Sequence, residues 1–260
     1  MNEHIITTVK KIANEELPHR FAQVTRNHKQ DGSFLTEADL AVQNKIQLLL
    51  KAAYPDVAFL GEEMSKQQQQ DELESDQGVW ILDPLDGTSN FAAGIPYYAV
   101  SLAYLKAGKI EWGLVYDPER DECFVATLGK GAELNGEPLT KQEAGVKLEK
   151  STAVIDFKRL NSDLAARIAS TPPYSSQRSF GGVALDWCWL AAGRFHLYLH
   201  GKQKIWDYAA GHLVFNEVGG HSCTLQNENV FDFSLNSRSA VAALDETLFL
   251  EWTDYLKIKQ

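Results

Sequence analysis

Two aspartates, Asp83 and Asp86, stand three residues apart in the stretch WILDPLDGTSNF, directly after a short apolar run. The run predicts a buried strand, and the proline that follows Asp83 cannot donate a ladder hydrogen bond, so we expect Asp83 at the C-terminal end of that strand. Asp86-Gly87 predicts a tight turn, and Thr88 can begin a short helix whose free backbone N–H groups suit an anion. The stretch therefore predicts carboxylates for a cation beside donors for a phosphate.

Three further acidic residues lie where the chain is expected to change direction. Glu62 follows the strand-like VAFLG, Asp207 follows KIW, and Asp39 lies in TEAD three residues after Thr36. Each has a structural alternative, because Glu62 suits an exposed loop, Asp207 a helix start and Asp39 a capping box. Taken together, carboxylates are the ligands that Mg²⁺ prefers, and two such ions about 3.5 to 4 Å apart can activate water for attack on phosphorus. The set predicts phosphoryl chemistry.

The first half of the chain must supply the elements that carry most of these acids. Apolar residues at helical spacing predict helices over 5–17 and 36–53. The glutamine-rich stretch 65–78 is polar and aperiodic, which predicts a solvated, mobile loop. From residue 97, short β-rich runs divided by turn residues predict an antiparallel meander.

The second half alternates strand-like and helical patterns, as α/β segments do. A helix is predicted over 183–192 and another from about 208 to 218, where Gly219-Gly220 would end it. We therefore expect a helix and antiparallel-sheet subdomain over 1–147, with most metal ligands, and an α/β subdomain over 148–260, with Asp207 and the substrate-side residues. The two would form one globular α+β unit.

Composition narrows the class of protein. With 260 residues, 44% of them hydrophobic, the chain can bury a full core. A formal net charge of −10 argues against a broad nucleic-acid surface. No apolar stretch approaches the roughly 18 residues of a spanning helix, and the N-terminus lacks the apolar region of a signal peptide. We expect a cytoplasmic protein with no membrane or nucleic-acid partner, and three reduced cysteines that lack metal-site spacing.

Four motifs resemble the inositol monophosphatase family, the lithium-sensitive, metal-dependent phosphatases. They are TEAD at 36–39, GEE at 61–63, DPLDGTSNF at 83–91 and WDYAAGHLVFNEVGG at 206–220. They run the length of the chain, and the last two are long and specific. The resemblance implies a layered αβαβα sandwich, a homodimer, a small phosphorylated substrate and two to three Mg²⁺ ions per active site.

The resemblance also implies a role for individual residues. Glu62, Asp83 and the backbone carbonyl of Leu85 would hold the first metal. Asp83, Asp86 and Asp207 would hold the second, and Glu62 would help hold a weaker third. The remaining implied roles are phosphate binding by the backbone N–H groups of Gly87 and Thr88, and orientation of the attacking water by Glu62 and by the Thr88 hydroxyl paired with Asp39. No phosphoenzyme would form.

The sequence departs from the family pattern on the substrate side. In inositol-specific members a glutamate precedes the Trp-Asp pair and binds sugar hydroxyls, whereas ungapped alignment places His200 there. A Ser or Thr often follows the glycine of the next substrate segment, but here Gly182 follows Gly181. His200, with Lys202 and Lys204, is either part of a solvated loop or a contact for a second phosphate or carboxylate.

Several functional alternatives stay open. Within the family, the chain could have fructose-1,6-bisphosphatase-like or 3′(2′),5′-bisphosphate nucleotidase activity. A haloacid-dehalogenase phosphatase also uses an Asp-Gly-Thr motif, but it needs Asp-x-Asp, whereas Asp83 and Asp86 are three apart. A regulatory or interaction protein that kept the fold and lost catalysis is the alternative from a different class.

Overall fold

The computed structural model describes residues 3–23, 27–28, 34–142 and 144–258. Two helices open the chain, α1 (Glu3–Glu16) and α2 (Glu37–Ala53), as the helical spacing predicts. Between them the two-residue strands β1 (Asn27–His28) and β2 (Phe34–Leu35) pair antiparallel. Helix α2 begins at a capping box, in which the Asp39 carboxylate accepts from the Thr36 backbone N–H at 2.7 Å.

A seven-stranded sheet carries the first half of the site. Its order follows the chain, and only the first pair is parallel; the later strands form the predicted antiparallel meander. The strands are β3 (Ala58–Gly61), β4 (Val79–Asp86), β5 (Ala99–Lys106), β6 (Lys109–Asp117), β7 (Glu122–Thr127), β8 (Ala132–Leu134) and β9 (Glu137–Pro138).

Alternate residues of this sheet enter different cores. Trp80 and Leu82 of β4 pack with α1 and α2, whereas Val79 and Ile81 pack into the core on the other face. All four are buried, and this two-residue period explains why the run reads as continuously apolar in the sequence.

A second sheet of five strands has the order β11-β10-β12-β14-β13. Strand β10 is parallel to β11 and β12, while β14 is antiparallel to β12 and β13. The bounds are β10 (Thr152–Asp156), β11 (Ser176–Arg178), β12 (Leu197–Gln203), β13 (His221–Cys223) and β14 (Arg238–Ala243).

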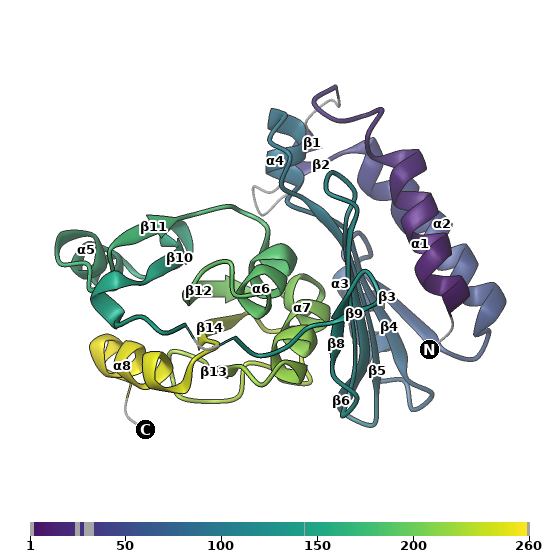
Figure 1. Ribbon diagram of the computed structural model, residues 1–260. Helices are drawn as coiled ribbons and strands as arrows, with labels where there is room; N and C mark the ends of the chain where they lie inside the picture. The colour runs from purple at the N-terminus through teal and green to yellow at the C-terminus, as the bar shows by residue number, and fades with distance from the viewer. Residues whose placement is uncertain (1–2, 24–26, 29–33, 143, 259–260) are drawn as a thin grey trace.

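Two helices, α6 (Val183–Ala191) and α7 (Ile205–Glu217), lie between the sheets, as Figure 1 shows. Their apolar residues share one core with the facing sides of both sheets. Helices α5 (Ser162–Ser170) and α8 (Glu246–Leu256) cover the outer face of the second sheet. The layers therefore alternate as αβαβα, which confirms the predicted α+β sandwich.

Two sequence-based element predictions were wrong in part. The stretch 65–78 is not a plain loop, because it contains α3 (Lys66–Leu73), which begins at a Ser65–Gln68 capping box and buries Gln69 and Leu73. Every residue of α3 except Leu73 is polar, so apolar periodicity could not reveal the helix. Helix α7 begins at Ile205 rather than near Tyr208, which places Asp207 within its first turn.

Across the described ranges, no helix combines the length and the apolar character needed to cross a membrane. The division into 1–147 and 148–260 stays a prediction. One core contains residues from both segments, for example Ile81 of the first and Tyr208 of the second.

Candidate active site

A cavity of about 370 Å³ lies beside the C-terminal ends of β3 and β4. All but one of the sequence-predicted site residues line it. These residues are Glu62, Asp83, Leu85, Asp86, Gly87, Thr88, Gly181, Gly182, His200 and Asp207. The exception is Asp39, which is fully buried behind Thr88.

The parallel pairing of β3 and β4 brings Glu62 beside Asp83. Gly61 is in register with Leu82, and the Glu62 N–H donates to the Leu82 carbonyl at 3.0 Å. Carboxyl ends of neighbouring parallel strands open at the same sheet edge, which is where ligands bind. The Gln69 amide of α3 donates to the carbonyls of Gly61 and Glu62, both at 3.0 Å, and fixes the turn that carries Glu62.

The pairing of β4 with β5 shifts between Asp83 and Asp86, so both carboxylates can reach the cavity. Gly87 then has φ +89°, and an added Cβ would lie 2.8 Å from the Tyr97 carbonyl. Only glycine meets both requirements without strain. Helix α4 (Thr88–Ala93) begins directly after it, which confirms the predicted turn and helix start.

The Thr88 hydroxyl lies between two acceptors. Its Oγ1 is 3.0 Å from the Leu85 carbonyl and 3.3 Å from Asp39 Oδ1. A hydroxyl has one proton, so it donates to one acceptor at a time. Asp39 thus completes the capping box of α2 and also neighbours Thr88, so its structural and functional interpretations do not compete.

Two further carboxylates are positioned by helix starts. Asp86 Oδ2 accepts from the Ala184 N–H at 2.7 Å, in the first turn of α6. Asp207 Oδ2 accepts from the Lys204 N–H at 2.8 Å, in the first turn of α7. Both helices belong to the middle layer, so the site joins the first sheet to that layer.

Burial and the repulsion between neighbouring carboxylates disfavour the ionised form of three of these acids. Burial raises the pKa of Asp83 well above its usual range, and the Glu62, Asp86 and Asp207 carboxylates raise it further. Burial and Asp207 do the same to Asp86. Burial, reinforced by Glu62, raises the pKa of Asp207 to about 7. A divalent cation would favour the ionised form of all three.

The donor set fits Mg²⁺ by its chemistry. It consists of carboxylate oxygens with one backbone carbonyl, all lining one cavity, and hard divalent cations are bound by such oxygens. Within the described part of the chain, no three His, Cys, Asp or Glu side chains are arranged so that they could hold a metal ion. Like charges oppose closer approach, and a cation would supply the attraction that brings these oxygens together.

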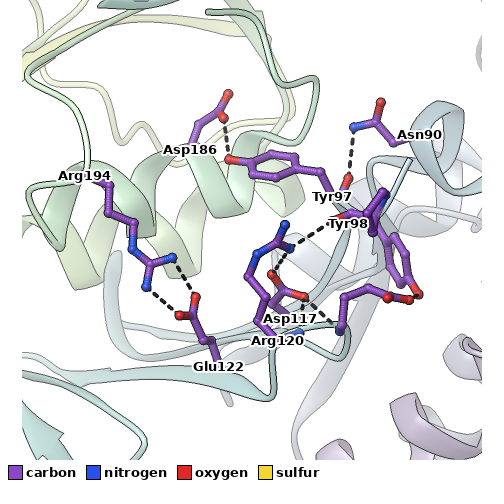
Figure 2. A network of polar contacts seen from close by, with 10 residues as sticks. Asn90, Tyr97, Tyr98, Asp117, Arg120, Glu122, Asp186 and Arg194 are labelled. Atoms are coloured by element: carbon purple, nitrogen blue, oxygen red, sulfur yellow. Dashed lines mark hydrogen bonds and ion pairs between the residues drawn. The ribbon is translucent and has the colours of Figure 1, made fainter. Parts of the chain in front are cut away.

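A polar network that includes two cavity-lining residues, Asn90 and Asp186, was not predicted. Figure 2 shows the Tyr97 hydroxyl pointing at Asp186 of α6, to which it donates at 2.8 Å, and Asn90 reaching the Tyr97 carbonyl at 2.9 Å. Asn90 also donates to the Phe180 carbonyl at 2.7 Å. Burial raises the pKa of Asp186 to about 8, although the Tyr97 hydrogen bond opposes the shift. The network attaches the Gly181 segment to α4.

The part of the cavity formed by the second sheet contains three residues that sequence reasoning did not single out. Asp156, Lys158 and Arg159 lie at the end of β10 and in the adjoining 3₁₀ turn η2 (Phe157–Arg159). Lys202 of β12, which the sequence had suggested as a possible contact for a second anion, lines the cavity beside them. His200 belongs to β12 and is buried, not part of a solvated loop. Asp156 follows an apolar strand run, as Asp83 does, and this signal in the sequence could have identified it. Asp156 ends β10, whereas β4 continues past Asp83 to Asp86, so the prediction that Asp83 ends its strand was wrong.

Comparisons with known proteins agree with this architecture. The model of the inositol monophosphatase family matches residues 1–253. Inositol monophosphatase 1 of Solanum lycopersicum is 36% identical over 229 residues, which cover 83% of this chain and 80% of that protein. A Pasteurella multocida protein named Nus factor SuhB is 34% identical over 219 residues, covering 83% and 79%. The solved structure of an IMPase/NADP phosphatase complexed with Mg²⁺ and phosphate matches with a TM-score of 0.82 and 25% identity, covering 97% of this chain and 94% of that one.

Proposed function

Because the chain belongs to the inositol monophosphatase family, we propose that it is a Mg²⁺-dependent phosphomonoesterase that hydrolyses a small phosphorylated polyol, sugar or nucleotide. The observation that carries the proposal is the cavity in which Glu62, Asp83, Asp86 and Asp207 meet the turn that begins α4. The structure with Mg²⁺ and phosphate, at 25% identity, supports the same chemistry.

The residues that would hold the metal follow from the family motifs. Glu62, Asp83 and the Leu85 carbonyl would bind one ion, and Asp83, Asp86 and Asp207 a second, with Glu62 contributing to a third. When bound, Mg²⁺ supplies Lewis acidity that lowers the pKa of water and offsets charge on the phosphoryl oxygens.

The protein's own groups would bind the phosphate and position the nucleophile. Backbone N–H groups of Gly87 and Thr88 would donate to phosphate oxygens. The Glu62 carboxylate would accept a proton from the attacking water, and the Thr88 hydroxyl, held by Asp39, would orient that water. A P–O bond forms to the water as the P–O bond to the leaving oxygen breaks, and that oxygen takes a proton from a second water. Because the chain belongs to the inositol monophosphatase family, we set aside the haloacid-dehalogenase alternative.

A binding role is the second candidate. The relative that is 34% identical bears the name Nus factor SuhB, so a regulatory interaction with another protein would be compatible with the same fold. The homodimer and lithium sensitivity implied by the family are part of the first proposal, and light scattering and inhibition by millimolar Li⁺ would measure them.

Phosphate release across a substrate panel tests the proposed activity. The panel consists of inositol phosphates, fructose 1,6-bisphosphate, 3′-phosphoadenosine 5′-phosphate and glycerol 2-phosphate, each with Mg²⁺ or with EDTA. We expect hydrolysis of at least one substrate that requires Mg²⁺. Purified, folded protein that hydrolyses none of them would favour the binding role.

A further inference from the structure

The cavity has two walls of opposite charge. The acidic wall contains the proposed metal ligands. The part of the lining formed by β10, η2 and β12 carries three cations, Lys158, Arg159 and Lys202, beside the single carboxylate of Asp156. We call these three cations the basic wall. Both walls line the same cavity.

The basic wall exists because η2 lies directly against β12. A Cβ added to Gly201 would lie 1.9 Å from the Arg159 carbonyl oxygen and 3.0 Å from the Leu160 nitrogen. Those atoms are backbone, so no side-chain rotation could relieve the overlap. Glycine at 201 thus allows Lys158 and Arg159 to line the same cavity as Lys202.

The buried side chain of His200 links the strands β10 and β12 next to the basic wall. Asp156 and His200 are register partners on the parallel strands β10 and β12, and His200 Nε2 lies 3.1 Å from Asp156 Oδ2. The Lys202 backbone N–H donates to His200 Nδ1 at 3.3 Å. Both ring nitrogens therefore bond protein groups, and Nε2–H is the donor to Asp156. His200 positions the ends of β10 and β12 relative to each other.

The cations of the basic wall are only partly neutralised within the protein. Arg159 Nε lies 3.9 Å from Asp156 Oδ2, and that carboxylate also accepts from His200. In the described ranges, neither Lys158 nor Lys202 has an acidic side-chain partner, and both are exposed. The protein as a whole has a net charge of −10, so three cations together on one part of the cavity lining are not what the overall composition would favour.

We propose that the basic wall binds a second anionic group of the substrate, so that the preferred substrate is a phosphomonoester with an additional phosphate or carboxylate. This inference rests on the proposed function and specifies its substrate class. The acidic wall with its cations would take the phosphate that is cleaved, and Lys158, Arg159 and Lys202 would hold the other anion. The cavity volume of about 370 Å³ is in the range of small-molecule sites.

Matched substrates that differ in one anionic group test the proposal and separate phosphate from carboxylate. The pairs are inositol 1-phosphate with inositol 1,4-bisphosphate, adenosine 3′-phosphate with 3′-phosphoadenosine 5′-phosphate, and glycerol 2-phosphate with 2-phosphoglycerate. We expect kcat/KM to be at least about tenfold higher for the doubly anionic member of at least one pair. Ratios at or below one in every pair would overturn the proposal.

Charge-removing variants assign the preference to the basic wall. The measured quantity is the ratio of kcat/KM for the doubly anionic substrate to kcat/KM for its singly anionic partner, in the pair with the largest ratio. We expect Lys158→Gln and Lys202→Gln each to lower this ratio about fivefold, as for loss of a partly exposed ion pair. The fall should come from a higher KM for the doubly anionic substrate. Lys109→Gln removes an exposed charge remote from the cavity and should keep the ratio. Equal losses on both members of the pair would contradict the assignment.

Gly201→Ala tests the backbone contact without removing a charge. We expect it to displace η2 and lower the ratio, while circular dichroism confirms that the protein is folded. An unchanged ratio in the folded variant would show that the η2 contact does not build the subsite. Failure of the subsite leaves Mg²⁺-dependent hydrolysis of both members of a pair, whereas failure of the proposed function leaves no hydrolysis at all.

Discussion

At the scale of single residues, Asp83 is the acid whose environment most clearly requires a counter-charge. It is 2% exposed, and three other carboxylates raise its pKa beyond the effect of burial. The Asp83 carboxylate accepts a hydrogen bond from the Leu85 N–H at 3.0 Å. A cation shared with Asp86 and Asp207 would offset this repulsion, so removal of the Asp83 charge should affect catalysis and metal-free stability in opposite directions.

Asp83→Asn should abolish hydrolysis and keep the fold. Loss of groups that merely orient metal ligands costs about 10- to 100-fold, so loss of a ligand should cost roughly 100-fold or more. The measurement is Mg²⁺-dependent phosphate release, with circular dichroism as the check on folding. Substantial activity in the folded variant would refute the assignment of Asp83 to the metal.

The acidic wall also predicts how stability depends on pH when no metal is bound. The pKa of Asp207 is raised to about 7 in the folded protein, against about 3.9 in an unfolded chain. Between these values the folded state binds more protons, so its stability should fall as pH rises from about 4 through about 7. Asp83 and Asp86 shift in the same direction.

Thermal unfolding in EDTA and in Mg²⁺ at a series of pH values would measure this effect. We expect the midpoint in EDTA to fall between about pH 5 and pH 8, and Mg²⁺ to remove most of the fall. Asp83→Asn should make the midpoint in EDTA fall less between these pH values. The same slope with and without Mg²⁺ would contradict the explanation.

At the scale of elements, α3 positions Glu62 although its sequence predicts a loop. Its capping box and the Gln67–Asp71 and Gln70–Glu74 hydrogen bonds stabilise a helix without an apolar stripe. Only Gln69 and Leu73 are buried, and Gln69 bonds the two carbonyls of the turn before α3. The helix therefore contacts the turn that carries Glu62 through the Gln69 amide, and Glu72 of the same helix accepts from the Phe59 N–H of β3 at 3.3 Å.

Gln69→Ala should lower activity by loosening that turn. It removes the Gln69 hydrogen bond from each of the two carbonyls, although the Gly61 carbonyl still accepts from the Met64 N–H at 3.2 Å. The loss costs about 1–3 kcal/mol of folding free energy, and we expect a loss in kcat/KM of roughly tenfold, as for other groups that orient ligands. Gln67→Ala, on the exposed face of the same helix, is the matched control and should keep wild-type activity. Equal effects of the two substitutions would mean that α3 stabilises the protein without positioning Glu62.

At the scale of the whole molecule, the middle layer ties the two sheets together. A Cβ on Gly113 of β6 would lie 2.8 Å from the Ala210 Cα of α7, so helix and sheet backbones are in direct contact. Asp207 lies on the same helix. The cleft between the acidic and basic walls therefore depends on how the two parts of the chain pack.

We propose that 1–147 and 148–260 form one cooperative unit. Each fragment expressed alone would expose its share of the common core, including Ile81 in the first and Tyr208 in the second, so neither should show a cooperative thermal transition. Co-expression of both fragments is the control. A cooperative transition in either isolated fragment would contradict a single unit.

Short sequence patterns predicted the features of the site that depend on residues close together in the chain. Acids after apolar runs, such as Asp83 and Glu62, identified the acidic wall, since strand ends and turns are encoded over a few residues. The basic wall depends on long-range contacts. His200 meets Asp156, which lies 44 positions earlier, through strand pairing that no local period reveals.

Gly201 gives a practical marker for comparing related sequences. Its missing side chain is what lets η2 approach β12, so any larger residue at the equivalent position should hold that turn, and its positive charges, farther from the cleaved phosphate. We expect this single position, compared together with the charges at 158 and 202, to sort family members by the total charge of the molecules that they hydrolyse.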